Sequence, residues 1–433
     1  MKRFAIDRLI EWKNSSEKKP LILNGARQVG KTWLMKELGE KYYKNYVYIN
    51  FDRTKDLGEI FDTDLEPKRI VRQIGAFLNK EINEDTLLIF DEIQEVPKAL
   101  ASLKYFNEDM PGQDIICAGS LLGLVLHHGI SFPVGKVEHL NIYPMTFSEF
   151  LLGTDRENLY NILAQSDWQM IKVLKERYIS ALKEYLFVGG MPGVINAFRE
   201  KSFEAAGKVQ DDILYYYDMD FSKHTEYRET EKIRMIWQSL SGQLAKENKK
   251  FIYGYIREGA KAKEYESAVR WLEDCGLIHK VYRVTVPKVP LNPYKDLKIF
   301  KIFLNDVGLL SRMSGLDYFD ILNKNEIFTE FKGALTEQYV CQELAAMNNL
   351  NFAYYKNDST RTEIDFIAKA GMGIVPIEVK SGENLHAKSL NAYMKKYEPE
   401  KAVRTSLADY KVTDNLYDIP LYAICKLREI LSN

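Results

Sequence analysis

Residues 21–42 read LILNGARQVGKTWLMKELGEKY, and this stretch decides the fold of the first part of the chain. A short apolar run, LIL, precedes GARQVGKT at 25–32, which matches the pattern GxxxxGK[ST], and a helical sequence follows. The glycines of such a loop let backbone N–H groups curl around phosphate oxygens at the positive end of a helix. The stretch therefore predicts a P-loop that binds a nucleoside triphosphate.

The residues of this loop have separate expected roles. Lys31 is expected to bridge the β- and γ-phosphates, and the Thr32 hydroxyl is expected to ligate magnesium. We expect the ligand to be ATP with Mg²⁺. The predicted binding residues are Gly25, Ala26, Arg27, Gln28, Val29, Gly30, Lys31 and Thr32.

A second piece of the predicted site is LLIFDEIQ at 87–94, an apolar strand that ends in two acids. An Asp at such a strand tip holds the magnesium of P-loop proteins, and an adjacent Glu can activate the attacking water. An isolated acidic pair after a strand is usually a helix cap or a solvated turn. Because this pair follows a P-loop, we assign Asp91 to the metal and Glu92 to the water.

Other residues could complete a hydrolytic site. The strand DIICAGS ends at Ser120, whose hydroxyl could sense the γ-phosphate or cap a helix. Hydrolysis also calls for a cation opposite the γ-phosphate, for which Lys136 and Arg27 are candidates by position. Exposed basic residues are mostly solvated, so both assignments compete with a surface role. The catalytic candidates are Glu92, Lys31, Ser120 and Lys136.

The composition limits the classes of function that the chain could have. The 433 residues carry 60 Lys and Arg against 61 Asp and Glu, so overall charge gives no argument for nucleic acid or a membrane. The four cysteines are scattered without the spacing of a zinc site or a disulfide framework. The beginning lacks the apolar run of a secretion signal, and no stretch approaches a membrane span. We expect a cytoplasmic protein with no membrane partner.

The pattern along the chain predicts an α/β multidomain protein. Apolar runs alternate with helical stretches over 1–145, which is typical of a parallel sheet covered on both faces. Residues 146–224 are helical by periodicity, with a turn at GGMPG. Three helices and a strand pair over 225–310, with FIYGYIREGA as the short middle helix, outline a winged helix. Residues 326–433 predict a second, smaller α/β domain.

These pieces together resemble the prokaryotic AAA-type ATPases that join a GxRQVGKT P-loop domain to a C-terminal domain of uncharacterised function. The resemblance covers essentially the whole chain and rests on NGARQVGKTWL, VYINFD, LLIFDEIQEVPKALASLKYF, AGSLLGL, GKVEHLNIYPMTFSEFL, EYLFVGGMPGVI, GALTEQYV, TEIDFI and PIEVKSG. It implies an AAA-type ATPase core at 1–145, a helical lid at 146–224, a winged helix at 225–310 and a restriction-endonuclease-like domain at 326–433.

The resemblance also bears on single residues. It implies ATP binding by Gly30, Lys31 and Thr32, magnesium at Asp91 and water activation by Glu92. Many relatives have Gly-Arg where this chain has Gly135 and Lys136, so an arginine-finger role is not carried over. Lysine keeps the charge at that position but lacks the bidentate fork of arginine.

A further candidate site lies near the C-terminus. Asp365 falls in the expected strand EIDFI, and Glu378 with Lys380 in PIEVK; strand residues at i and i+2 share a face. Two carboxylates could hold Mg²⁺ while the lysine positions a water, with Glu337 in a supporting helix. The set resembles a PD-(D/E)xK nuclease core. A solvated sheet edge, or a binding module that keeps the acids without cutting, is the competing interpretation.

DNA is the expected macromolecular partner on local grounds. Residues 225–290 contain 13 Lys and Arg against 9 Asp and Glu, which is typical of phosphate-contacting surfaces and also of ordinary soluble ones. We expect an ATPase whose nucleotide state controls the winged-helix and nuclease-like domains, acting on DNA. An ATP-regulated, magnesium-dependent DNA nuclease and an ATP switch for a protein partner are the alternatives. A homo-oligomer is compatible with this reading.

Overall fold

The computed structural model describes residues 1–119, 133–225, 227–244, 250–322 and 326–432. They divide into two compact units. The first unit contains Lys2–Tyr143 and the short segment Asp274–Leu277. The second unit contains Met1, Pro144–Glu273 and Ile278–Asn433.

The first unit contains a five-stranded sheet in the order β2-β3-β4-β1-β5, and every pairing in it is parallel. Its strands are β1 (Leu21–Asn24), β2 (Asn45–Asn50), β3 (Thr86–Asp91), β4 (Ile115–Ala118) and β5 (Glu138–Asn141). All residues of β3 and β4 are buried, as expected for strands covered on both faces. The parallel sheet predicted from the uninterrupted apolar runs is therefore present.

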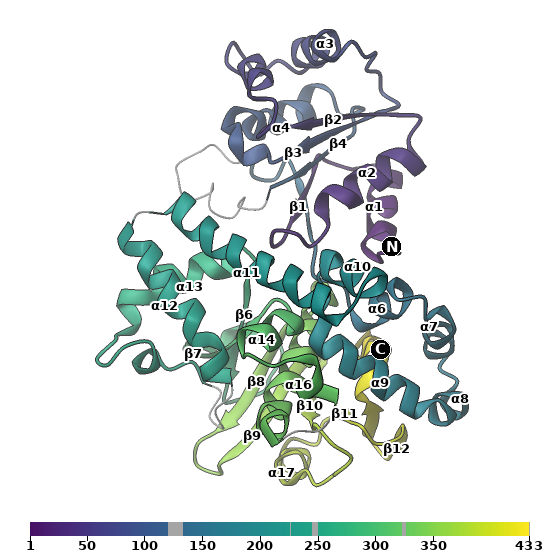
Figure 1. Cartoon of the computed structure of the whole chain (residues 1–433), viewed down its shortest axis with the longest axis vertical. Coiled ribbons are helices and arrows are strands. Elements are labelled where there is room, and N and C mark those ends of the chain that lie inside the picture. Colours follow the sequence, from purple (N-terminus) through teal and green to yellow (C-terminus); the bar gives the residue numbers. More distant parts are fainter. Residues whose placement is uncertain (120–132, 226, 245–249, 323–325, 433) are drawn as a thin grey trace. The chain divides into compact units, whose positions relative to one another are not determined.

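Helices cover both faces of this sheet (Figure 1). They are α1 (Ala5–Asn14), α2 (Lys31–Tyr42), α3 (Pro67–Leu78) and α4 (Pro97–Asp109), with 3-10 turns η1 (Lys55–Phe61) and η2 (Ile93–Glu95). The face under α3 and α4 packs as one apolar cluster that includes Leu88, Phe90, Ile70 and Leu103. Burial of such side chains is worth about 1.5–3 kcal/mol each and fixes the sheet that carries the P-loop.

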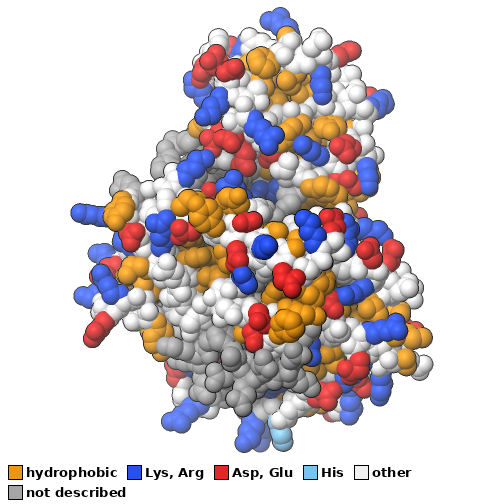
Figure 2. Space-filling model, in the orientation of Figure 1, with side chains coloured by type: hydrophobic (Ala, Val, Ile, Leu, Met, Phe, Trp, Pro, Cys, Tyr) orange, Lys and Arg blue, Asp and Glu red, His pale blue; other side chains and the backbone are white. Residues whose placement is uncertain are grey.

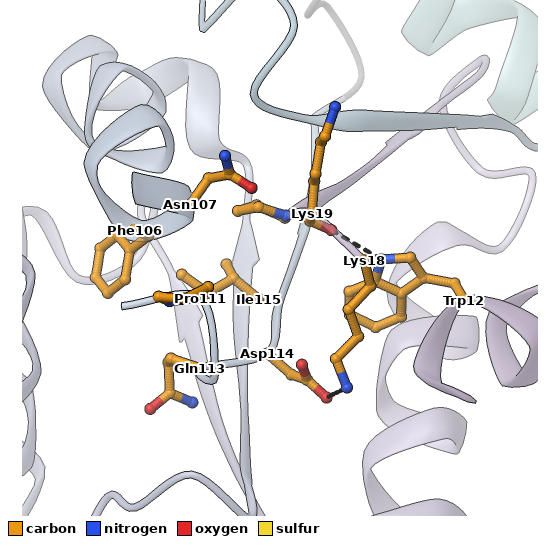
Figure 3. A pocket seen from close by; sticks show the side chains of 10 residues that line it. Trp12, Lys18, Lys19, Phe106, Asn107, Pro111, Gln113, Asp114 and Ile115 are labelled. Atoms are coloured by element: carbon orange, nitrogen blue, oxygen red, sulfur yellow. Dashed lines mark hydrogen bonds and ion pairs between the residues drawn. The ribbon is translucent and has the colours of Figure 1, made fainter. Parts of the chain in front are cut away.

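The start of β1 is tied to its surroundings by polar contacts (Figure 3). The Trp12 indole N–H donates to the Lys19 carbonyl at 2.8 Å, and the Lys18 ammonium pairs with the Asp114 carboxylate at 2.9 Å. A small pocket among these residues borders Pro20 and Ile115, where β1 and β4 begin. It therefore lies at the amino edge of the sheet, whereas the P-loop follows the carboxyl end of β1.

The second unit begins with a run of helices, as the periodicity over 146–224 predicts. These helices are α6 (Phe147–Gly153), α7 (Glu157–Ala164), α8 (Trp168–Val173), α9 (Lys175–Val188), α10 (Pro192–Glu200) and α11 (Phe203–His224). The turn expected at GGMPG separates α9 from α10. It needs glycine because Gly189 has φ +73° and a Cβ on Gly190 would lie 2.1 Å from the Met145 carbonyl oxygen.

The segment that follows departs from the prediction of three helices and a hairpin. α12 (Tyr227–Leu244) and α13 (Ala262–Asp274) are present, but FIYGYIREGA contains only the 3-10 turn η3 (Tyr253–Tyr255). The predicted middle helix is wrong. Gly254 and Gly259 weaken a helix there, and Gly259 adopts a left-handed backbone with φ +77° that interrupts it.

One large sheet joins two regions that we predicted as separate domains. Its order is β12-β13-β11-β10-β9-β8-β6-β7. The strands are β6 (Ile278–Val284), β7 (Lys295–Leu304), β8 (Phe352–Asn357), β9 (Thr362–Ala370), β10 (Gly373–Val379), β11 (Ala402–Ser406), β12 (Lys411–Thr413) and β13 (Leu416–Pro420). The hairpin expected as the wing, β6–β7, continues the C-terminal sheet because β6 pairs with β8 in parallel.

The remaining helices of this unit are α14 (Val307–Met313), α15 (Tyr318–Leu322), α16 (Glu326–Ala346), α17 (Lys388–Tyr397) and α18 (Leu427–Ser432), with 3-10 turns η4 (Asn292–Tyr294) and η5 (Leu421–Lys426). Within the described ranges, no helix is both long enough and apolar enough to cross a membrane. Positive and negative side chains are interspersed over the face in Figure 2, without a broad area of one sign.

Candidate functional site

The predicted P-loop connects β1 to α2, where strand, loop and helix follow one another as the motif requires. Gly25 has φ +137°, and a Cβ there would lie 2.2 Å from the Ile142 carbonyl oxygen, so only glycine fits. Gly30 caps α2 with φ +97° in the left-handed region. Both glycines of the motif are thus needed for the path of the backbone. The α2 N-terminus faces the loop and favours an anion there.

Lys31 reaches back into the loop. Its ammonium donates to the carbonyl oxygens of Gly25 at 2.7 Å and Ala26 at 2.8 Å, and its side chain is buried. Burial lowers the pKa of Lys31 to about 8, although the charges of Glu92 and Asp91 act in the opposite direction. The ammonium is thus held by dipoles of the loop that is expected to bind phosphate.

Arg3 contacts the P-loop, which could not be predicted from the sequence. One guanidinium nitrogen donates to the Val29 carbonyl and another to the Tyr143 carbonyl, each at 2.7 Å. Arg3 is 6% exposed, and its bond to Val29 is buried. It fixes the middle of the loop to the segment after β5. Its position near the N-terminus, outside every motif, gave no signal.

The magnesium residues predicted from two distant motifs meet at the end of β3. The Thr32 hydroxyl donates to Asp91 Oδ2 at 2.9 Å. Tyr48, on β2, donates its hydroxyl to the same oxygen at 2.8 Å. Asp91 is 4% exposed, and burial raises the pKa of its carboxyl against the effect of these hydrogen bonds. Tyr48 was missed because an aromatic residue in the strand VYINFD is ordinary strand composition.

Glu92 directly follows this carboxylate. Its backbone is left-handed with φ +51°, and its Oε2 accepts a hydrogen bond from Gln94 Nε2 at 2.7 Å. A non-glycine residue with positive φ is uncommon and often marks a functional turn. The bend places a second carboxylate beside the predicted metal ligand, and Gln94 orients it.

This arrangement fits Mg²⁺. The hydroxyl of Thr32 and the carboxylate of Asp91 are hard oxygen donors already within hydrogen-bonding distance of each other. Mg²⁺ in phosphate-binding sites takes one or two protein oxygens and completes its shell with water and phosphate. Thr32 and Asp91 would hold the ion, which would neutralise charge on the β- and γ-phosphates.

The other residues predicted for the ATP site are not all brought to the P-loop. Ala26 and Val29 are buried, whereas Arg27 and Gln28 are exposed. Ser120 lies outside the described residues. Lys136 pairs with Glu108 of α4 at 2.9 Å and precedes β5, whose Glu138 lies opposite Leu21 at the start of β1. Lys136 is therefore at the amino edge of the sheet and is not brought to the P-loop of the same chain.

The predicted C-terminal set does come together. The Val379 N–H of β10 donates to Asp365 Oδ2 of β9 at 2.8 Å, and Lys380 Nζ donates to Glu378 Oε1 at 2.7 Å. Glu337 projects from α16 and is 8% exposed. A buried lysine that was not predicted, Lys301 of β7, also belongs to the cluster. The assignment of Mg²⁺ to Asp365 and Glu378 stays a prediction.

Comparison with known families divides the chain into three parts. Residues 17–151 match a model described as AAA domain, residues 179–320 match a domain of unknown function, DUF8612, and residues 332–424 match another, DUF4143. No curated protein matches.

Solved structures include, among others, three proteins that are similar to this chain. The Walker-type ATPase PABY2304 of Pyrococcus abyssi is 16% identical with a TM-score of 0.43, covering 72% of this chain and 95% of that one. The Orc1 protein of Aeropyrum pernix, solved in complex with DNA, is 12% identical with a TM-score of 0.26, covering 72% and 91%. Cdc6p of Pyrobaculum aerophilum is 12% identical with a TM-score of 0.25, covering 74% and 93%.

The family match and the site geometry agree on the first part of the chain. The matched residues 17–151 contain the whole P-loop and the Asp91–Glu92 pair. The chain thus carries an ATPase domain of the AAA P-loop type.

Proposed function

We propose that this domain binds ATP with Mg²⁺ and hydrolyses it through Lys31, Thr32, Asp91 and Glu92. The observation that carries the proposal is the 2.9 Å bond from Thr32 to Asp91, which joins the two predicted magnesium ligands beside the loop lysine. Lys31 contacts the β- and γ-phosphates in this scheme, and Glu92 accepts a proton from the attacking water. The roles rest on the placement of these groups around one loop.

The test is ATP hydrolysis by the full chain with Mg²⁺, compared with the variant Glu92→Gln. The amide keeps the size of the side chain and its position beside Asp91 but cannot take a proton at neutral pH. We expect Glu92→Gln to bind ATP with nearly unchanged affinity while the rate of hydrolysis falls by about 10²-fold or more. A matched control is Glu95→Gln, which changes an exposed acid of the same turn. Equal rates for wild type and Glu92→Gln would remove Glu92 from the mechanism.

The wider proposal is that nucleotide state controls the second unit and, through it, DNA. Its support is the local excess of basic residues over 225–290, with Lys261 and Lys263 exposed at the start of α13. Exposed ammonium groups contact phosphates, and such binding weakens steeply with salt. Nearby Arg257 pairs with Glu264 at 3.4 Å, so its charge is partly neutralised.

Fluorescence anisotropy of a labelled duplex, titrated with ATP-bound and ADP-bound protein, tests this wider role. Binding that weakens with salt, depends on the nucleotide and falls in Lys261→Glu with Lys263→Glu is the expected result. An intact ATPase with no affinity for DNA at low salt would favour the switch for a protein partner instead.

A further inference from the structure

The acidic cluster of the second unit is built around a buried ammonium. Lys301, on β7, is 2% exposed, and its Nζ lies 2.9 Å from Glu363 Oε1 and 3.8 Å from Glu337 Oε2. Its Nζ also lies 4.8 Å from the centroid of the Tyr354 ring, whose face attracts a cation. Four elements of the fold, β7, β8, β9 and α16, thus converge on one lysine.

The carboxylates around this lysine already have partners of their own. Lys356 Nζ forms an ion pair with the other oxygen of Glu363, Oε2, at 2.8 Å. Lys380 Nζ forms an ion pair with Glu378 Oε1 at 2.7 Å. Asp365 accepts the N–H of Val379. Among the described residues, Glu378 Oε2 is a buried oxygen without a hydrogen-bond partner. The cluster therefore contains three ammonium groups beside its four carboxylates.

A divalent ion does not fit this arrangement. Mg²⁺ needs oxygen ligands at about 2.0–2.1 Å in octahedral geometry, and Ca²⁺ needs six to eight at about 2.3–2.6 Å. Asp365, Glu378 and Glu363 each already have at least one carboxylate oxygen bonded to an N–H or ammonium group. A bound ion would also have to share a water-poor site with the Lys301 charge. Like charges in such a site repel strongly.

We propose that the Lys301 ammonium is the fixed counter-ion of this cluster, in the role that a divalent metal has in a nuclease. The cluster then holds β7, β9 and α16 together by charge, and it binds no catalytic magnesium. The C-terminal part of the chain acts in this scheme as a binding or coupling module. Phosphodiester cleavage through Asp365 and Glu378 is not part of its chemistry.

The first test compares metal binding by the nucleotide-free full chain and by Lys301→Met. Methionine fills a similar volume without the charge, so the variant leaves the carboxylates without their central cation. We expect Mn²⁺ to raise the melting temperature of Lys301→Met and to give a bound electron paramagnetic resonance signal, while wild type shows neither effect. Lys356→Met is the matched control, because it removes an ammonium from Glu363 but leaves the central one in place.

A second set of variants keeps the proposal testable if Lys301→Met does not fold. The double variant Lys301→Met with Glu363→Gln removes one positive and one negative charge together, and we expect it to fold without metal. A comparison of wild type with Asp365→Asn tests the proposal without using either variant of Lys301. Mn²⁺ binding by wild type that disappears in Asp365→Asn would overturn the proposal. So would magnesium-dependent plasmid cleavage by wild type that Asp365→Asn abolishes, while ATP hydrolysis is followed separately.

Discussion

Two buried lysines of this chain, Lys31 and Lys301, have opposite environments. Lys31 donates to neutral carbonyl oxygens at 2.7 and 2.8 Å, and burial lowers its pKa to about 8. Lys301 lies among carboxylates, and their charges raise its pKa despite burial. Both side chains are nearly inaccessible, so burial alone does not distinguish them.

The difference shows how a buried cation can be assigned a role. An ammonium whose hydrogen-bond partners are neutral carbonyl oxygens still gains free energy from an anion, which suits it to phosphate binding. An ammonium already matched by carboxylates has little to gain and instead fixes the fold. By this criterion Lys31 belongs to a ligand site and Lys301 to the architecture.

The largest expected effect is on stability, and it compares the two lysines directly. Lys301→Met should lower the free energy of unfolding of its unit by about 3–5 kcal/mol, because it leaves buried carboxylates without their ammonium. Lys31→Met should cost much less, because the lost hydrogen bonds are offset by removal of a poorly compensated charge. Hydrogen exchange of the amides in β7 and β9, beside those in β1 and β3, checks both. Equal losses would break the comparison.

The second effect is on activity and runs in the other direction. Lys31→Met should lower kcat/KM for ATP hydrolysis by about 10²–10³-fold, because it removes a cation from the transferring phosphate. Lys41→Met is the control, since Lys41 is an exposed residue of the same helix that pairs with Glu37. Steady-state phosphate release measures all three proteins. A similar loss in Lys41→Met would place the defect in helix α2 and not in the loop.

The contrast also explains what could be predicted from sequence. The P-loop, Asp91 and Glu92 were assigned because their neighbours are fixed by a short motif and a strand end. The bond from Thr32 to Asp91 follows once β1 and β3 lie in one parallel sheet. Lys301 could not be assigned in this way. It sits in the strand sequence LKIFKIFL, where a lysine reads as a solvent-facing residue.

The fold was predictable to a similar extent. Local periodicity was enough for the parallel sheet of the first unit and for the helices over 146–224. The pairing of β6 with β8 was not, because Arg283 and Tyr354 are far apart in the chain and only tertiary packing brings them together. The middle helix over 251–260 failed for a local reason, because Gly254 weakens a helix there and Gly259 adopts a left-handed backbone with φ +77°. Arg3 could not be predicted either, because its bonds to the carbonyls of Val29 and Tyr143 also depend on tertiary packing.

The third expected effect is a proton taken up when ATP binds. Phosphate favours the charged form of Lys31, so binding should raise its pKa from about 8. Affinity is then constant well below pH 8 and falls as the pH rises through 8, because the free protein has lost the proton that the complex needs. Calorimetry at pH 8 in buffers of different ionisation enthalpy should show uptake of about half a proton.

Lys31→Arg provides the control for this proton uptake. Arginine stays charged at every pH of interest, so the variant should bind without taking up that proton even if its affinity is lower. Uptake that persists in Lys31→Arg would assign the proton to another group. In that case the difference between Lys31 and Lys301 would rest only on the groups that contact each ammonium.

The smallest effect concerns the carboxylates near the two lysines. Asp91 is held by hydroxyl groups of Thr32 and Tyr48, which a metal can replace or share, whereas the C-terminal acids are held by ammonium groups. Tyr48→Phe should therefore raise the Mg²⁺ concentration needed for half-maximal hydrolysis by about 10-fold, since a partner that orients the ligand is lost. Tyr46→Phe, on the same strand, removes a hydroxyl bonded to the exposed Glu40 and should leave the requirement unchanged. An unchanged requirement in Tyr48→Phe would mean that Thr32 alone orients the carboxylate. The hydroxyl of Tyr48 would then stabilise the strand and not the ion.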